Sequence, residues 1–181
     1  NNSKLAQAMS RLRTHGITRN IDEMTKEPDG VWYYQQIELG YNYRMTDIQA
    51  ALGISQFKRL DEMVSRRHVL AEQYNNLLNN LPLKLPYQDP NGYSSYHLYI
   101  IRLEDATKHK KTFDNLRANM IGVNIHYIPV YHHPYHGNIK SYASDFPNSE
   151  LYYSTAMSIP LYPAMSDQDQ LKVVKAIEKS L

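Results

Sequence analysis

The sequence predicts an α/β fold that ends in a small α+β domain. A capped helical pattern of about 35 residues begins at residue 46 and is longer than a typical helix. Alternating apolar residues follow at 96–103, and helical and extended patterns then alternate up to the last residue. We expect the elements in the order helix, long connection, long helix, strand, helix, strand, helix, helix.

The first helix is expected to begin at Ser3, which favours an N-cap, and to end at Gly16, which favours a C-cap. Residues 17–45 show little periodicity and predict a long connection. Connections of this length in a compact protein are usually functional or disordered. The aromatic residues at 32–34 favour the functional alternative.

A capping box begins the long helical stretch, because Thr46 and Gln49 can each accept a hydrogen bond from the backbone of the other. Asp47 suits the positive end of the helix dipole. Apolar residues then recur at helical spacing, with a bend expected near Asp61. We expect two consecutive helices or one long bent helix, ended by Pro82.

The next part of the chain predicts a strand, a helix and a second strand. Residues 96–103 are rich in β-forming residue types and predict the first strand. Thr107 is expected to cap a helix that ends at Gly122. Residues 123–128 predict the second strand directly afterwards.

The last part of the chain carries two more helix starts. Ser149 is expected to cap a short helix that runs through Met157. Two prolines keep residues 159–163 extended. Ser166 is expected to cap the final helix, whose apolar residues recur at helical spacing.

Composition excludes several classes of protein. The 20 Lys and Arg residues nearly balance the 18 Asp and Glu residues, so the net charge of +2 does not indicate a nucleic acid or an anionic membrane as partner. The lack of cysteine excludes a disulfide scaffold, a zinc–thiolate site and a thiol nucleophile. Mean hydropathy is −0.60, and no apolar run approaches the roughly 20 residues that span a bilayer. We expect a cytoplasmic chain that binds neither nucleic acid nor membrane.

Tyrosine is abundant, with 16 residues among 181. Because the ring is apolar and the hydroxyl is polar, tyrosine suits both cores and interfaces. One interpretation is a small domain with a tyrosine-rich core. The other is a chain that completes its burial against another domain or subunit.

An Asn and an Arg directly precede the capped helix, in the sequence Gly40-Tyr41-Asn42-Tyr43-Arg44-Met45. Backbone amides at a helix N-terminus favour an anion, and a guanidinium matches the oxygens of a phosphate. Asn42 and Arg44 are therefore candidate phosphate ligands. The alternative is that Arg44 forms a surface ion pair and Asn42 only forms a turn.

Four histidines lie within the eleven positions 126–136. His132 and His136 have helical spacing, but Pro134 prevents one helix from presenting both to a metal. No carboxylate lies in the segment to complete a metal-binding triad, so we expect no metal site. A polar loop that lines a ligand site and a plain surface loop are the remaining alternatives.

The sequence Trp32-Tyr33-Tyr34 stands near Arg13 and Arg19. Aromatic rings beside positive charge can bind nucleotides or sugars, but the same residues suit a packed loop between subunits. The sequence has no glycine-rich phosphate-binding motif and no nucleophile elbow. By themselves these residues do not identify a reaction.

The stretch from Leu39 to Gly53, which contains Gly-Tyr-Asn-Tyr-Arg-Met-Thr-Asp-Ile-Gln, closely resembles the DegT/DnrJ/StrS family of pyridoxal-phosphate sugar aminotransferases. The resemblance covers essentially the whole chain and implies the fold type I of these transferases. Its other motifs are Arg13-x-His15-Gly16, Tyr96-His97-Leu98-Tyr99, His126-Tyr127-Ile128-Pro129-Val130 and Ser158-Ile159-Pro160-Leu161-Tyr162-Pro163.

The resemblance implies that the chain is the C-terminal portion of a longer enzyme. The lysine that forms the Schiff base in family members lies upstream of the first residue, and Lys4 does not stand in its motif. We expect residues 1–45 to hold the end of the large domain and a loop that reaches the cofactor. Residues 46–181 are expected to form the connecting helices and the small domain. No catalytic residue is expected here, and the chain alone is expected to be inactive.

The resemblance also implies the ligands. In family dimers the loop that matches Asn42 and Arg44 contacts the cofactor phosphate of the other subunit, so pyridoxal 5'-phosphate and a homodimer are expected. His97 is expected to be a structural strand residue. The implied substrate-binding residues are Trp32, Tyr33, His126, Tyr127, Tyr131 and His132.

The implied activity of the intact enzyme is transfer of an amino group from glutamate to C4 of a UDP-4-keto-6-deoxy-amino sugar. This places it in nucleotide-sugar biosynthesis of the pseudaminic acid type. The alternative is a naturally short, non-catalytic relative that binds a sugar nucleotide or a partner subunit. The coding sequence just upstream of Asn1 discriminates between the two, because only the enzyme requires a lysine-containing cofactor motif there.

Overall fold

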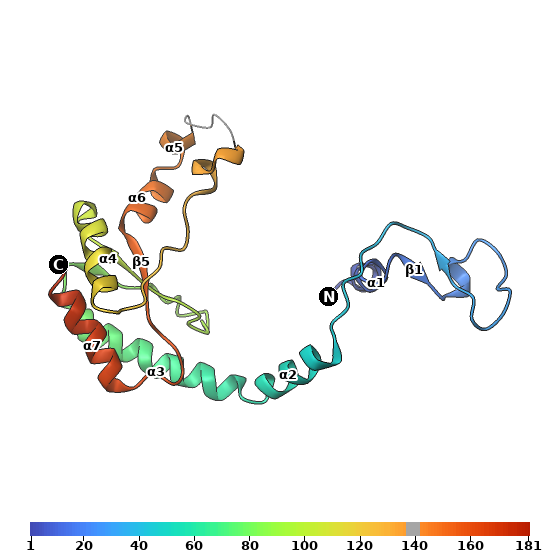
Figure 1. The fold of residues 1–181 in the computed structure, drawn as a ribbon, viewed down its shortest axis with the longest axis horizontal. Coiled ribbons are helices and arrows are strands. Elements are labelled where there is room, and N and C mark those ends of the chain that lie inside the picture. The colour runs from blue at the N-terminus through green and yellow to red at the C-terminus, as the bar shows by residue number, and fades with distance from the viewer. Residues whose placement is uncertain (137–141) are drawn as a thin grey trace. The chain divides into compact units, whose positions relative to one another are not determined.

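The chain divides into two compact units in a computed structural model that describes residues 1–136 and 142–181 (Figure 1). The N-terminal unit is Asn1–Lys58 and the C-terminal unit is Arg59–Leu181. The mixture of helices and strands confirms the predicted fold class. The functional division at residue 46 stays a prediction.

The N-terminal unit has two helices and a two-stranded sheet. Its elements are α1 (Ser3–Leu12), β1 (Ile17–Thr18), the 3₁₀ turn η1 (Ile21–Glu23), β2 (Gln35–Gln36) and α2 (Asp47–Phe57). The strands β1 and β2 are antiparallel, and Ile17 stands opposite Gln36. The long connection predicted between the helices therefore contains only these short elements.

Both predicted ends of the first helix are wrong. Asn2 is the N-cap, because its side chain accepts from the Leu5 N–H (3.0 Å), whereas Ser3 is already helical. The helix ends at Leu12 with Arg13 as its C-cap. Gly16 lies beyond the helix with a φ of +70°, so its conformational freedom serves the following turn.

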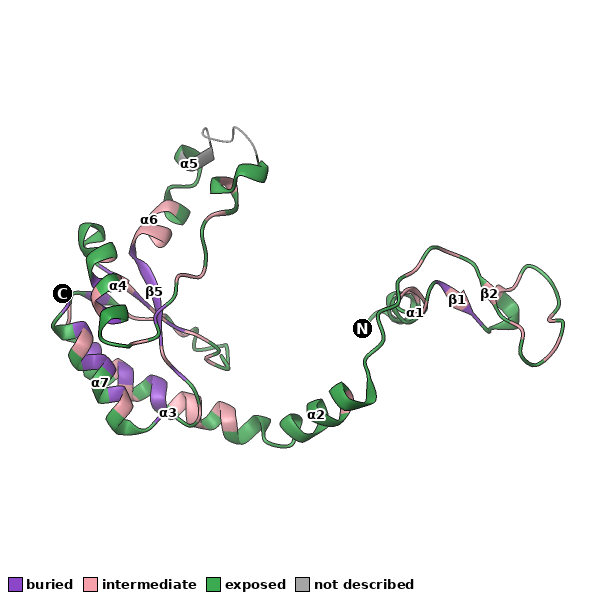
Figure 2. Cartoon of the chain, viewed as in Figure 1, coloured by how far each residue is buried: buried purple, intermediate pink, exposed green. Residues whose placement is uncertain are grey.

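The capping box of α2 is confirmed. The Gln49 N–H donates to Thr46 Oγ1 (3.3 Å), and the Thr46 N–H donates to Gln49 Oε1 (2.9 Å). As one of the two predicted alternatives requires, α2 is followed by a second helix, after the two residues Lys58 and Arg59. No residue of α2 is buried within the described residues (Figure 2).

The C-terminal unit contains a three-stranded sheet and several helices. Its helices are α3 (Leu60–Leu78), α4 (His109–Ala118), α5 (Tyr142–Asp145), α6 (Pro147–Thr155) and α7 (Asp167–Glu178). Its strands are β3 (Leu83–Lys84), β4 (Tyr99–Leu103) and β5 (Ala156–Ile159), and its 3₁₀ turns are η2 (Ala106–Lys108), η3 (Val130–His132) and η4 (Pro134–His136). No helix in the described ranges combines the length and apolar character that crossing a membrane requires.

The sheet has the order β3–β4–β5, and both pairs are antiparallel. Alternate residues of β4 point to opposite faces. Tyr99, Ile101 and Leu103 are buried in the core, whereas Ile100 and Arg102 face the other side. We call these the core face and the open face of the sheet. Figure 2 shows that burial concentrates in β5, α3 and α7.

Two tyrosines belong to this core. Tyr74 and Tyr99 are fully buried, and their hydroxyls donate to Pro160 O (2.9 Å) and Asn75 Oδ1 (2.6 Å). Burial raises the pKa of both hydroxyls, because a phenolate loses its hydration there. Other tyrosines are more than half exposed: Tyr34, Tyr41, Tyr43, Tyr87, Tyr93, Tyr127 and Tyr135. A tyrosine-rich core therefore accounts for only part of the abundance of tyrosine.

Several predicted boundaries in this unit are wrong. Asp105, rather than Thr107, caps the turn before α4, because its carboxylate accepts from the Thr107 N–H (2.9 Å). The helix ends at Ala118, before Gly122. Residues 123–128 form no strand, and only an isolated bridge joins Asn124 to Ser158 of β5. A strand requires several consecutive residues to pair with a neighbouring strand. β-forming residue types are therefore not sufficient where a single residue is paired.

The helix predicted from Ser149 through Met157 is present, but both of its predicted ends are wrong. Ser149 lies inside α6, which begins two residues earlier at Pro147, because proline suits the first turn of a helix. The helix ends at Thr155, and Met157 belongs to β5. Ser166 caps α7 as predicted, since its hydroxyl accepts from the Asp169 N–H (3.1 Å). The strand predicted at 96–103 is present only at Tyr99–Leu103. His97, which is predicted to be a structural strand residue, lies outside this strand and is exposed.

Candidate functional site

Residues 40–44, here called the arginine loop, are tied to the end of α1 by backbone hydrogen bonds. The His15 N–H donates to Tyr41 O (2.7 Å), and the Tyr41 N–H donates to Leu12 O (2.6 Å). The Tyr43 N–H donates to Arg13 O (2.9 Å). The loop is therefore fixed by main-chain contacts that do not depend on its own side chains.

Two glycines make this close approach possible. A Cβ atom at Gly40 would lie 2.2 Å from the backbone nitrogen of Gly16. A Cβ at Gly16, whose φ is +70°, would lie 1.9 Å from the backbone oxygen of Glu38. Neither space admits a side chain, so both positions require glycine.

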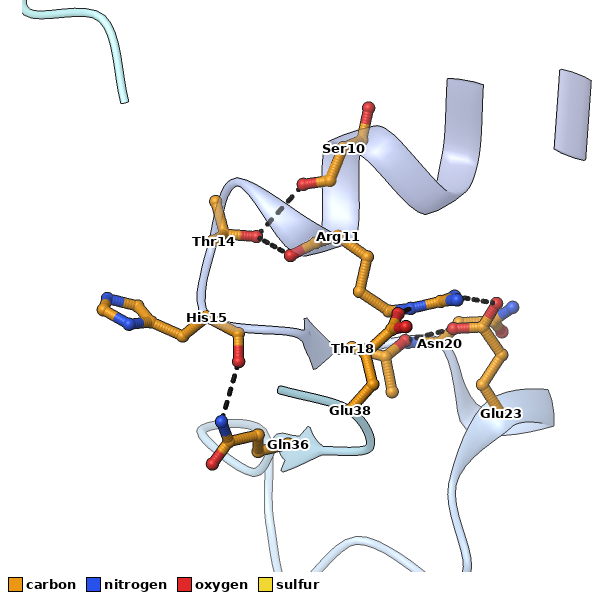
Figure 3. A network of polar contacts seen from close by, with 9 residues as sticks. All are labelled: Ser10, Arg11, Thr14, His15, Thr18, Asn20, Glu23, Gln36 and Glu38. Atoms are coloured by element: carbon orange, nitrogen blue, oxygen red, sulfur yellow. Dashed lines mark hydrogen bonds and ion pairs between the residues drawn. The ribbon is translucent and has the colours of Figure 1, made fainter. Parts of the chain in front are cut away.

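An ion-pair network braces the same junction (Figure 3). Arg11 of α1 donates from Nε to Glu38, which precedes the arginine loop, and lies 3.3 Å from Glu23 Oε1 of η1. The other oxygen of Glu23 accepts from the Thr18 hydroxyl (2.6 Å). The hydrogen bond with Glu38 is the largest of the influences that raise the pKa of Arg11. The network thus connects α1, β1, η1 and the start of the loop.

Asn42 and Arg44 lie together on the arginine loop. Arg44 donates from Nε to Asn42 Oδ1 (2.8 Å), which holds the guanidinium while leaving its two NH₂ groups and the Asn42 amide NH₂ available as donors. Arg44 forms no ion pair within residues 1–136 and 142–181. The NH₂ groups left available are donors and carry one positive charge between them, and α2 begins shortly afterwards. This donor set can bind an anion with several oxygens, such as a phosphate.

The aromatic residues of the N-terminal unit pack within their own segment. The Trp32 ring lies over Gly30 and stays 70% exposed. Gln35 donates to the Tyr33 hydroxyl (3.0 Å), and Lys26 Nζ lies 5.0 Å from the centre of the Tyr33 ring. None of the hydrogen bonds, ion pairs or ring contacts in the described residues joins Trp32 or Tyr33 to the arginine loop.

His126, in the C-terminal unit, is held from the open face of the sheet. A hydrogen bond of 2.7 Å joins its Nδ1 to Ser158 Oγ, and Asn124 Nδ2 lies 3.4 Å from its Nε2. Ser158 is only 5% exposed and belongs to β5, so the sheet holds its backbone in place. The Tyr127 ring meets the imidazole edge to face, with 4.7 Å between the ring centres. The sequence did not identify Ser158 as a site residue, because its partner is 32 positions away.

We expect Ser158→Ala to free the His126 ring. Loss of the hydrogen bond should cost about 0.5–1.5 kcal/mol of unfolding free energy. Chemical denaturation measures this, and the ring nitrogen chemical shifts of His126 in an NMR spectrum should report a changed tautomer population. Ser154→Ala is the matched control, because the Ser154 hydroxyl donates to Leu151 O within α6. Unchanged His126 shifts in Ser158→Ala would contradict the contact.

Tyr131 and His132 form an aromatic cluster with α6 and the residue before it. His132 Nε2 lies 2.8 Å from Glu150 Oε1, and the Tyr131 ring stacks on Phe146 with 5.5 Å between centres. Burial of the Tyr131 hydroxyl raises its pKa, and the neighbouring Glu150 adds to this. A cleft of about 560 Å³ opens beside the cluster, lined by Tyr127, Pro129, Val130, Tyr131, Phe146, Asn148, Ser149 and Tyr152.

The four predicted substrate residues of this unit thus form two groups. His126 and Tyr127 contact each other, and Tyr131 and His132 contact each other. Tyr127 and Tyr131 both line the cleft. In the part of the chain that the structure describes, no three His, Cys, Asp or Glu side chains gather as metal ligands. Glu150, which orients His132, is a second residue that the sequence did not identify.

The chain resembles known proteins over nearly its whole length. It is 38% identical to protein MJ1066 of Methanocaldococcus jannaschii, covering 98% of this chain and 47% of that protein. It is 32% identical to the UDP-4-amino-4,6-dideoxy-N-acetyl-β-L-altrosamine transaminase of Campylobacter jejuni, covering 93% of this chain and 43% of that enzyme. The chain therefore spans less than half the length of these relatives.

The fold matches that of solved aminotransferases. PseC of Helicobacter pylori, an aminotransferase involved in pseudoaminic acid biosynthesis, superimposes with a TM-score of 0.82 at 23% identity, over 99% of this chain and 47% of PseC. Residues 1–178 match the DegT/DnrJ/EryC1/StrS aminotransferase family, whose members depend on pyridoxal phosphate. Since the match covers both units and includes the arginine loop, the chain belongs to the DegT/DnrJ/EryC1/StrS aminotransferase family.

Proposed function

We propose that this chain is part of a cytoplasmic, homodimeric enzyme that transfers an amino group from glutamate to C4 of a UDP-4-keto-6-deoxy-amino sugar. The reaction belongs to nucleotide-sugar biosynthesis of the pseudaminic acid type. The observation that carries the proposal is the Asn42–Arg44 pair, a donor set fixed on the glycine-braced arginine loop. The name of the Campylobacter jejuni relative supports the choice of sugar.

The donor set fits the phosphate of pyridoxal 5'-phosphate. Arg44 supplies two NH₂ groups and a positive charge, and Asn42 holds the guanidinium through Nε. When bound, the cofactor supplies an electron sink that stabilises negative charge on the reacting carbon. The role of Arg44 and Asn42 is to retain the phosphate, and in the homodimer they reach the cofactor of the partner subunit.

The C-terminal unit supplies part of the substrate-binding surface. His126 and Tyr127 hold the substrate from the open face of the sheet, with His126 oriented by Ser158. Tyr131 and His132 line the aromatic cleft, with His132 oriented by Glu150. The amphipathic ring of tyrosine suits both sugar hydroxyls and apolar sugar faces. Trp32 and Tyr33 are proposed to contact the same substrate.

Arg44→Ala in the intact enzyme is expected to weaken cofactor binding about tenfold or more, because charge-assisted hydrogen bonds to the phosphate are lost. Titration of the apoenzyme with pyridoxal 5'-phosphate, followed by absorbance, gives the dissociation constant. Arg59→Ala is the control, since Arg59 forms no ion pair in the described ranges. Equal cofactor affinity in wild type and Arg44→Ala would remove the phosphate role.

The same preparation tests the reaction itself. The intact enzyme is incubated with glutamate and a panel of 4-keto sugar nucleotides, and the product is analysed for a new C4 amine. Amination of a UDP-4-keto-6-deoxy-amino sugar supports the proposal. Binding of the sugar nucleotide without amination would instead favour the non-catalytic alternative.

A further inference from the structure

The open face of the sheet carries two cations directly opposite each other. Lys84 of β3 pairs in register with Arg102 of β4. Because residues in register project to the same face, both side chains leave the sheet on the side away from the core. Directly opposed side chains have Cβ atoms only about 4.5–5.5 Å apart, and like charges at that position are destabilising.

The pair has no acidic ion-pair partner among the residues that the structure describes. Neither Lys84 nor Arg102 forms an ion pair or a side-chain hydrogen bond within residues 1–136 and 142–181. Glu104, the first residue after β4, lines a separate cleft with Asp105 and Lys108. Like charges directly opposite each other are destabilising, so an anion that neutralises this pair would bind favourably.

The two cations line a cleft of about 420 Å³, together with Tyr87, Ile100 and Tyr152. Tyr152 comes from α6, which contacts β4, so one wall of the cleft is a helix and the floor is the sheet. Burial raises the pKa of the Tyr152 hydroxyl, while the charge of Arg102 acts in the opposite direction. The hydroxyl therefore stays protonated and can donate to a bound anion.

We propose that this cleft binds the phosphate group of a small phosphate ester. A phosphate carries nearly two negative charges at neutral pH and can neutralise both cations, whereas a carboxylate carries one. Arg102 presents a planar fork to two phosphate oxygens, and Lys84 presents a point charge from the neighbouring strand. The rings of Tyr87 and Tyr152 supply apolar surface for the organic part of the ester.

The proposed phosphate site lies near the proposed substrate-binding residues, but the proposal does not depend on their role. Arg102 stands opposite Ala156, and Ser158, which holds His126, is its diagonal neighbour on the open face. Such neighbours lie about 7–8 Å apart, within the reach of a single nucleotide diphosphate. The proposal concerns phosphate binding at the Lys84–Arg102 pair and stands whether or not the intact enzyme aminates a sugar.

Calorimetric titration of the full chain with inorganic pyrophosphate tests the proposal. Lys84→Gln and Arg102→Gln are each expected to weaken binding about tenfold, because each removes one charge-assisted contact. Lys111→Gln on α4 is the control for net charge, since it removes one positive charge from an exposed residue outside the cleft. Absence of binding, or equal weakening in Lys111→Gln, would overturn the proposal.

The ligand-free protein gives a second and independent readout. Because Lys84 and Arg102 repel each other, Lys84→Gln is expected to raise the melting temperature by about 1–3 °C. Pyrophosphate is expected to raise the melting temperature of the wild type and to have little effect on Lys84→Gln. A lower melting temperature in ligand-free Lys84→Gln would show that Lys84 has a structural role, and would count against the proposal.

Discussion

Replacing Gly40 by alanine is expected to break the junction between the end of α1 and the arginine loop. The new Cβ would lie 2.2 Å from Gly16 N and 2.7 Å from Leu12 O. Both are backbone atoms, so no side-chain rotation can relieve the clash and the main chain itself must move. We expect a local cost of about 3 kcal/mol or more, at the upper end for overpacking substitutions.

Amide hydrogen exchange measures this effect where it occurs. The His15 and Tyr41 amides donate across the junction in the native chain, and both should exchange faster in Gly40→Ala. Gly53→Ala is the matched control, because no atom lies within 4 Å of its new Cβ. In the middle of α2 that change should stabilise the helix by about 0.5–1 kcal/mol. Native exchange rates in Gly40→Ala would contradict the close packing.

The Gly40 junction also explains how an exposed loop can hold a well-defined ligand. Arg44 is exposed, and its side chain donates to that of Asn42, two positions away. The side chains alone would leave the pair free to move, but the main-chain contacts fix the backbone that carries it. If Arg44 binds the cofactor phosphate, Gly40→Ala should therefore weaken cofactor binding without touching the phosphate.

Local signals predicted some helix starts and missed others, such as those at Asn2 and Asp105. The capping box at Thr46 and the cap at Ser166 depend on residues three positions apart, and both are present. The local pattern left open a break or a bend near Asp61, and the break lies at Lys58 and Arg59. The Asn42–Arg44 contact is equally local, since the two residues are separated by one position. Their binding role stays a prediction from the family resemblance.

Contacts between residues far apart in the sequence could not be predicted from it. Residues 123–128 have the composition of a strand, yet only Asn124 bridges to β5, so the expected strand is absent. The contact of His126 with Ser158 and the opposition of Lys84 and Arg102 both depend on strand register. A sequence specifies which face each residue takes, but not which residue of another strand stands opposite.

Leu78→Ala is expected to have the second large effect, on the stability of the C-terminal unit. The side chain is fully buried where α3 meets the sheet. Removing it loses apolar burial and leaves a cavity, which typically costs about 2–5 kcal/mol. Chemical denaturation followed by circular dichroism measures the loss. The helix residues that share this buried side are Leu70, Ala71, Tyr74 and Leu78.

Leu77→Ala is a stringent control, because it removes the same atoms from the adjacent position of the same helix. The Leu77 residue is 39% exposed, so its loss should cost less than about 1 kcal/mol. Equal losses in the two variants would mean that α3 presents a different side to the sheet.

The two faces of the sheet should also respond differently to substitution. Folded Leu78→Ala should bind pyrophosphate as the wild type does, because Leu78 belongs to the core face, whereas Arg102→Gln should weaken binding with little loss of stability.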